Sequence, residues 1–136
     1  TWVTVLLESH GDVVWKDDLE RIIKSVNNNQ VQLIWDITNM WTVTRETPDE
    51  VFAKLKPYIK HVHIKDAKLN GTILDYVLLG QGDTPIMQAI DLLVKSNYKG
   101  YYSFEWEKRW HPEIAEPELA IADFARVMRE QWNTRY

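Results

Sequence analysis

Four short apolar runs alternate with four stretches of helical periodicity along this chain. The apolar runs cover residues 2–7, 31–35, 59–64 and 101–104, and each has the length of a strand. In the stretches that follow them, apolar residues recur every three or four positions, which is the spacing of one helix face. Strands that alternate with helices in this way predict crossover connections and a parallel sheet, and therefore the α/β class.

Start signals mark the four helices. The first is predicted over residues 17–26, with two aspartates in its first turn. The second begins at 47–48, where an N-capping threonine, a proline and Glu50 form a capping box. Threonine and proline at 84–85 predict the start of the third helix, and Pro117 that of the fourth.

The segment between the third apolar run and the third helix is polar and contains several turn residues. We expect a long loop there, in which Gly82 supports a turn and Asp83 caps the helix that follows. This segment is therefore predicted to have a structural role.

Two architectures are compatible with this order of elements. One is a small doubly wound sheet, and the other is half of a (β/α)8 TIM barrel. The first apolar run is not followed by a glycine-rich phosphate turn, which is the mark of a nucleotide-binding sheet. A complete barrel needs about 250 residues, whereas this chain has 136.

Composition narrows the functional classes. The chain is 45% hydrophobic and 26% charged, with a formal net charge of −4 and no basic run, so we expect no nucleic-acid partner. It has no cysteine, which rules out disulfides and thiolate metal sites and favours a cytoplasmic protein. No run is long enough to span a bilayer, and no signal peptide is recognisable. The first residue is Thr1, which suggests a fragment of a longer protein.

Ionisable residues stand at the ends of the four predicted strands: Glu8, Asp36, His63 and Glu105. In a parallel barrel the carboxyl ends of the strands meet at one mouth, so these residues are expected to become neighbours. Burying three carboxylates without a cation would be costly. This oxygen-rich set suits Mn²⁺, Mg²⁺ or Co²⁺, and Zn²⁺ is an acceptable alternative.

Several segments around these strand ends resemble one known group of proteins. The chain is similar to the sugar phosphate isomerase/epimerase superfamily, which consists of xylose isomerase-like TIM barrels. The resemblance implies that residues 1–136 supply the last four βα units, a C-terminal half barrel. The segments that carry it are LLESHGD (6–12), IWD (34–36), HVHIKD (61–66), LGQGD (79–83) and GYYSFEWE (100–107).

The resemblance also implies roles for individual residues. Glu8, Asp36, His63 and Glu105 would bind one divalent ion, and the two glutamates would act as a catalytic acid/base pair on opposite faces of the substrate. The implied activity is metal-dependent isomerisation or epimerisation of a sugar or polyol, through proton abstraction next to a carbonyl and an enediolate. Many relatives have a histidine where this chain has Asn39, which bears on the substrate and the reaction.

Further side chains are candidates for substrate binding. His10 follows Glu8 on the mouth side. Lys65 shares the strand face of His63, where it could bind an anionic group, transfer a proton or pair with an acid as a barrel-layer residue. His61 is expected to be a core residue or to support the metal ligands, and not to be a ligand itself. One or two substrate contacts are expected from the loop after the fourth strand, which is rich in aromatic and basic side chains: Trp106, Lys108, Arg109, Trp110 and His111.

Alternatives remain open at this point. A dehydratase of keto-sugars or cyclitols would use the same ion and base. An apurinic-site endonuclease shares the fold, but four histidines and a net charge of −4 fit its zinc cluster and DNA face poorly. The isolated half could also be inactive, since half of the pocket wall would be missing. Its open sheet edges predict that it docks onto the missing half or forms a homo-oligomer.

Overall fold

The computed structural model describes residues 3–133, which form six strands and five helices. The elements in chain order are β1 (Val5–Glu8), α1 (Lys16–Val26), β2 (Val31–Asp36), α2 (Ile37–Thr44), α3 (Pro48–Leu55), β3 (Ile59–Ile64), β4 (Asp66–Asn70), β5 (Ile73–Val77), α4 (Ile86–Lys95), β6 (Tyr102–Phe104) and α5 (Pro117–Asn133). The first strand begins later than the apolar run suggested, and Trp2 lies outside the described residues.

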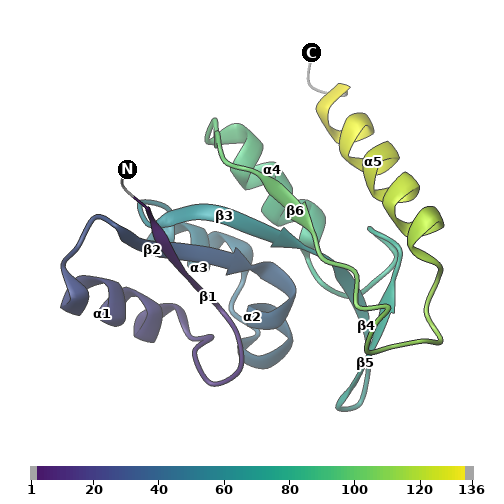
Figure 1. Cartoon of the computed structure of the whole chain (residues 1–136), viewed down its shortest axis with the longest axis horizontal. Helices are drawn as coiled ribbons and strands as arrows, with labels where there is room; N and C mark the ends of the chain where they lie inside the picture. Colours follow the sequence, from purple (N-terminus) through teal and green to yellow (C-terminus); the bar gives the residue numbers. More distant parts are fainter. Residues whose placement is uncertain (1–2, 134–136) are drawn as a thin grey trace.

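The main sheet contains four parallel strands in the order β1-β2-β3-β6 (Figure 1). This arrangement confirms the prediction of an α/β fold with a parallel sheet. The strands β1 and β6 are the outer strands of the described sheet, and each pairs on one side only. At β1 the apolar side chain of Val5 is 60% exposed, as expected for a sheet edge without a neighbour.

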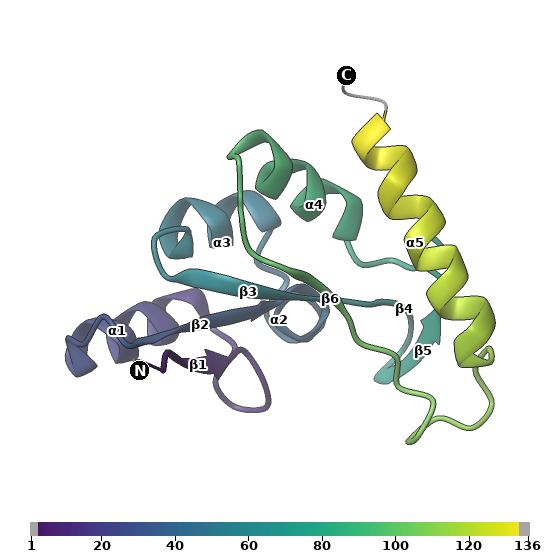
Figure 2. The same cartoon turned by 45° about the horizontal axis from the view of Figure 1, so that its top comes forward.

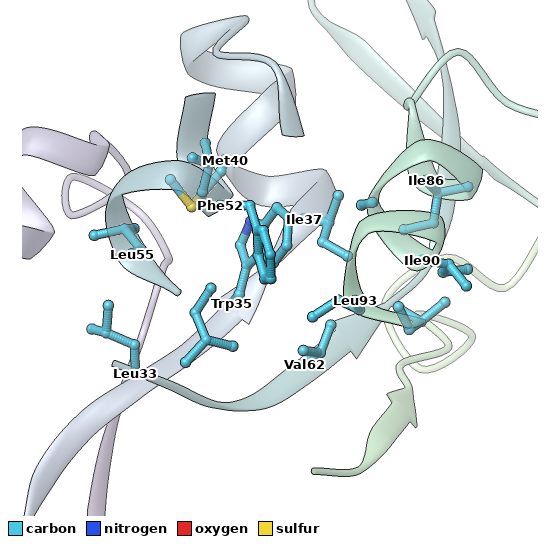
Figure 3. Packing of buried hydrophobic residues seen from close by; sticks show 14 of the residues in the cluster. Leu33, Trp35, Ile37, Met40, Phe52, Leu55, Val62, Ile86, Ile90 and Leu93 are labelled. Carbon is cyan, nitrogen blue, oxygen red and sulfur yellow. The ribbon is translucent and has the colours of Figure 1, made fainter. Parts of the chain in front are cut away.

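Helices cover one face of this sheet. Figure 2 shows α3 and α4 above β3 and β6, and α3 packs against both α1 and α4. Figure 3 shows side chains from alternate positions of β2 and β3, such as Leu33, Trp35 and Val62, directed at apolar residues of the helices. This alternation places the remaining strand residues on the opposite face, which forms the interior of a complete barrel.

The last helix contacts the body through aromatic pairs. Phe124 of α5 stacks on Phe104 of β6 at a centroid distance of 4.7 Å, and Trp132 meets Tyr102 at 5.7 Å. No helix in the described part of the chain is long and apolar enough to cross a membrane.

The capping signals of α3 are confirmed. The hydroxyl of Thr47 accepts the N–H of Glu50, and the Glu50 carboxylate accepts the N–H of Thr47 at 2.7 Å. Asp17 and Asp18 occupy the first turn of α1, as predicted. These local interactions involve residues close in sequence, which is why the sequence pattern identifies them.

The helix α2 was not predicted. Its sequence, ITNMWTVT, is rich in β-branched residues, which are weak helix formers. Tertiary contacts stabilise it instead, because Ile37, Thr38 and Met40 are buried. Its N-cap is Asp36, whose carboxylate accepts the N–H of Asn39 at 2.8 Å.

The prediction of a long polar loop is wrong for the first part of this segment, where β4 and β5 form an antiparallel hairpin. Asn70 pairs with Ile73, so the loop between them has two residues. Gly71 is the first of these and has a φ of +64°, as a type II′ hairpin turn requires. The asparagine–glycine pair was the available signal for this turn.

The rest of that segment is a structural loop, as predicted, but its interactions differ. Asp83 does not cap α4; its carboxylate accepts the N–H of Leu69, which fastens the hairpin to the loop. The helix begins at Ile86, and its cap position makes no side-chain hydrogen bond. The buried carboxylate of Asp66 holds the loop by accepting the N–H groups of Gly80 and Gly82, each at 2.9 Å.

Candidate metal centre

Four ionisable side chains converge at the carboxyl ends of the parallel strands. Glu8 ends β1, Asp36 ends β2, His63 lies one residue before the end of β3, and Glu105 directly follows β6. Each offers one oxygen or nitrogen atom, and these atoms all lie within 4.8 Å of one another. The parallel register produces this arrangement, since Asp36 pairs with His63 and the N–H of Glu105 bonds the carbonyl of Ile64.

The imidazole of His63 lies among the three carboxylates. Its Nδ1 is 2.8 Å from Oε1 of Glu8, 3.7 Å from Oε2 of Glu105 and 3.9 Å from Oδ2 of Asp36. Exposure increases outward across the cluster, from 0% for the Asp36 side chain to 37% for that of Glu105. The site therefore has a buried floor and an open rim that a small molecule can reach.

Asp36 is fixed from several directions. Its backbone N–H donates to Oγ of Ser9 at 2.9 Å, and its Oδ1 accepts the N–H of Asn39. Burial raises the pKa of Asp36 to about 6, against the opposing influence of the ammonium group of Lys65. This carboxylate is costly to keep charged without a nearby cation.

Lys65 supplies that cation. Its side chain is 2% exposed, and its Nζ donates to Oδ2 of Asp36 at 2.7 Å and to Oε2 of Glu105. Burial by itself would lower the pKa of Lys65, but the two carboxylates raise it above its ordinary value. Burial would likewise raise the pKa of Glu105, but the hydrogen bond from Lys65 holds it below its usual range. Of the three roles considered for Lys65, namely anion binding, proton transfer and pairing with an acid, the structure shows the pairing with acids.

The donor set fits a divalent ion. Three carboxylates and one imidazole face a common point, and Lys65 is the only ammonium group bonded to this cluster among the described residues. Negative charge therefore exceeds positive charge around the convergent atoms, and hard oxygen ligands dominate. A divalent ion there would bind through Glu8, Asp36, His63 and Glu105.

Two of the predicted substrate residues lie beside this cluster. His10 and Asn39 line a cavity of about 150 Å³ together with Gly11, Val14, Thr42, Val43 and Leu74. The side-chain amide of Asn39 lies 3.5 Å from the carbonyl oxygen of Ser9. Asn39 joins this cavity to the cluster, because its backbone N–H donates to Oδ1 of Asp36 at 2.8 Å.

The loop after β6 is largely held by its own side chains. Trp106 donates its indole N–H to the carbonyl of Ala115, and Lys108 donates to the carbonyls of Pro112 and Ile114. The Arg109 guanidinium lies 5.0 Å from the ring centroid of its neighbour Trp110.

His111 differs from the other loop residues because its ring meets Tyr76 of β5 in an edge contact at 4.9 Å. His61 packs edge-on against His63 at 5.5 Å, on the barrel side of β3. Burial, followed by the neighbouring His63, lowers the pKa of His61.

Three side chains near the cluster were missed by the sequence reasoning. The carboxylate of Glu107 lies 3.4 Å from Nζ of Lys65, and Ser9 fixes the backbone of Asp36. Tyr76 comes from the unpredicted hairpin and is half-buried. Glu107 lies two positions after Glu105, beyond the end of β6, and this spacing was the available signal; Ser9 and Tyr76 carried none.

Comparison with known protein families agrees with this architecture. Residues 2–131 match the model of a family described as xylose isomerase-like TIM barrel. Among solved structures, a xylose isomerase domain protein from Planctomyces limnophilus superposes with a TM-score of 0.74 at 23% identity, covering 94% of this chain and 44% of that one. A D-tagatose 3-epimerase-like protein gives a TM-score of 0.74 at 19% identity, covering 96% of this chain and 47% of that one.

Among curated proteins, an inosose dehydratase from Clostridium botulinum is 27% identical over 121 residues. The match covers 77% of this chain and 40% of that protein. The chain thus spans less than half the length of the relatives it matches. The matched relatives and structures include both epimerases and dehydratases.

Proposed function

The chain belongs to the xylose isomerase-like TIM-barrel family, and we propose that it supplies the metal-binding half of an enzyme that isomerises or epimerises a sugar or polyol. The observation that carries this proposal is the convergence of Glu8, Asp36, His63 and Glu105 within 4.8 Å. Residues 1–136 would form the last four βα units of the barrel.

The residues of this chain divide the chemistry between them. Glu8 and Glu105 stand on strands separated by β2 and β3, so a substrate bound over His63 would have a carboxylate on either side. Glu105, which Lys65 keeps ionised, would accept a proton from the carbon next to a carbonyl. Glu8, hydrogen-bonded to His63, would return a proton on the other face. A bound divalent ion would supply stabilisation of the negative charge that develops on the carbonyl oxygen.

Exchange of substrate protons with solvent tests this chemistry. Incubation of ketoses with the chain, Mg²⁺ and deuterated water should place deuterium on the carbon next to the carbonyl, as followed by proton NMR. Glu8→Gln and Glu105→Gln should each slow the exchange by at least about 100-fold, because general acid/base groups contribute factors of that order. Glu118→Gln on α5 removes the same charge far from the cluster and should leave the rate unchanged. Equal exchange rates in all three variants would contradict the assignment.

A dehydratase of keto-sugars or cyclitols is the second candidate. The curated relatives are inosose dehydratases, and Asn39 replaces the histidine expected of many isomerases and epimerases. Elimination would begin with the same proton abstraction but would then expel a hydroxyl group. Its conjugated product absorbs in the ultraviolet, whereas an epimer does not, so absorbance during the exchange experiment separates the two reactions.

We also propose that the open edges of the sheet are covered in the working protein, either by four further βα units or by a second copy of this chain. A cytoplasmic location remains a prediction from the sequence.

Self-association can be measured directly. At micromolar concentration the chain should elute as a dimer in size-exclusion chromatography with light scattering, because β1 and β6 each leave one side unpaired. Val5→Lys places a charge on the exposed edge of β1 and should shift the equilibrium towards monomer. Ile121→Lys, at a 55% exposed site on α5, is the matched control. A clean monomer of the unaltered chain would exclude the second copy as the covering partner.

A further inference from the structure

We infer that the part of the substrate pocket formed by this chain accepts an uncharged sugar or polyol and disfavours a phosphorylated or otherwise anionic one. This inference rests on the proposed function and adds to it the charge class of the substrate. Three features carry it: the partners of Lys65, the charge of the cluster, and the lining of the cavity beside it.

Lys65 is the basic side chain that contacts the cluster directly, and its ammonium group already has carboxylate partners. Its ammonium group contacts carboxylate oxygens of Asp36, Glu105 and Glu107. An ammonium group has three N–H donors; two of them hydrogen-bond Asp36 and Glu105, and the Glu107 carboxylate lies 3.4 Å from Nζ. The side chain is also 2% exposed, which leaves no surface for a phosphate oxygen.

The cluster as a whole is negative. Four carboxylates, those of Glu8, Asp36, Glu105 and Glu107, surround the single ammonium group of Lys65. A divalent ion reduces this excess but still leaves one negative charge. A phosphate dianion placed nearby would therefore be repelled, whereas hydroxyl groups would not.

The cavity beside the cluster lacks the basic side chains of a phosphate-binding site. Its lining contains no Asp, Glu, Lys or Arg among the described residues. His10, Asn39 and Thr42 offer hydrogen-bonding groups to hydroxyls, and Val14, Val43 and Leu74 offer apolar contacts to C–H groups. The hydrogen-bonding and apolar groups of this cavity therefore match the hydroxyl and C–H groups of a polyol.

Three further cations among the described residues, Lys108, Arg45 and Arg109, make contacts away from the cluster. Lys108 bonds two carbonyls of its own loop and pairs with Glu116 at 2.8 Å. Arg45 lines the next cavity, but its guanidinium donates to the carbonyl of Trp41 and lies 4.5 Å from that ring. Arg109 lies over Trp110 in an exposed turn of the loop.

Binding of matched sugars tests the inference. The probes are D-fructose and D-fructose 6-phosphate, with D-allulose and its 6-phosphate as a second pair, added to the Mg²⁺-loaded chain. Saturation-transfer difference NMR gives the dissociation constants, and solvent deuterium exchange is followed in the same samples. Each neutral ketose should bind about three- to tenfold more tightly than its phosphate, as expected for repulsion by one net charge across a partly screened site.

A charge variant makes the test independent of the catalytic residues. Val43 lines the cavity and is 60% exposed, so Val43→Arg adds a guanidinium at the rim with little effect on folding. It should tighten binding of the phosphates about three- to tenfold relative to its effect on the neutral ketoses, which lose the apolar contact with Val43. Ile121→Arg makes the same change in charge on α5 and should alter the binding of neither the phosphates nor the neutral ketoses.

The outcomes separate this inference from the proposed function. Phosphates that bind and exchange deuterium as well as the neutral ketoses, or better, overturn the neutral-substrate inference and leave the proton-transfer function standing. If neither class binds or exchanges, the proposed function fails and the inference fails with it. Preferential binding of the neutral ketoses, reversed towards the phosphates only by Val43→Arg, supports both.

Discussion

Replacing Lys65 with methionine is expected to lower the free energy of unfolding of the metal-free chain by about 3–5 kcal/mol, the usual cost of removing one partner from a buried ion pair. The side chains of Lys65 and Asp36 are 2% and 0% exposed. Without the ammonium group, the Asp36 carboxylate would be buried with no counter-charge. Urea denaturation in the presence of EDTA, followed by circular dichroism, gives the loss.

The pH dependence of this loss has a definite sign. Removing Lys65 should raise the pKa of Asp36 in the folded state further above the ordinary value of an aspartate. A carboxyl group whose pKa is raised by folding destabilises the folded state above the unfolded pKa, and the penalty disappears as the pH falls below it. The loss in the Lys65→Met variant should therefore shrink as the pH is lowered from 7 towards 4.

Matched variants keep the test decisive if Lys65→Met folds poorly. Lys65→Arg retains the charge and should be less destabilised. The double variant Lys65→Met/Asp36→Asn should recover part of the loss, because it removes the uncompensated carboxylate as well. Lys60→Met, at an exposed position of β3, should cost less than about 0.5 kcal/mol. A loss below about 1 kcal/mol in Lys65→Met would show that the ion pair contributes little.

Replacing Asp36 with asparagine is expected to weaken Mn²⁺ binding by at least about 100-fold, since even residues that only orient metal ligands cost up to that factor. Asparagine retains an oxygen that can accept the N–H of Asn39, so α2 keeps its cap. Isothermal titration calorimetry measures the affinity. For the unaltered chain, affinity should also fall as the pH drops through about 6, because protons then compete with the ion for Asp36.

The control for this experiment lies in the same region of the molecule. Asp12 is an exposed aspartate in the loop after β1, and Asp12→Asn changes the net charge by the same amount. It should leave Mn²⁺ affinity within about twofold, because an exposed charge is strongly screened. An Asp36→Asn variant that still binds Mn²⁺ like the Asp12→Asn control would rule out this cluster as the metal site.

Much of the fold was predictable because it depends on short-range patterns. The helix stripe of α1 and the capping box at Thr47 involve residues within one or two turns of each other. The ligand candidates were predictable for a different reason. Parallel strands align their carboxyl ends, so Glu8, Asp36 and His63 could be placed together from their order alone.

The missed elements depend on contacts distant in sequence. The propensities of the α2 residues oppose a helix, and burial against β3 and α4 decides its conformation. The β4–β5 hairpin was hidden in a polar segment whose alternation is weak, and its anchoring by Asp66 and Asp83 is visible only in three dimensions.

The sequence by itself determined the α/β class, the order of the four parallel strands and of the helices α1, α3, α4 and α5, and which four side chains lie at the ends of the parallel strands, because these follow from periodicity and strand direction. Only the tertiary structure decided what those side chains meet. It placed the ammonium group of Lys65 between Asp36 and Glu105, brought Glu107 beside it, and left an uncharged cavity next to the cluster. Pairing and burial set the charge that a substrate encounters, and both depend on distances between residues that are far apart in the chain.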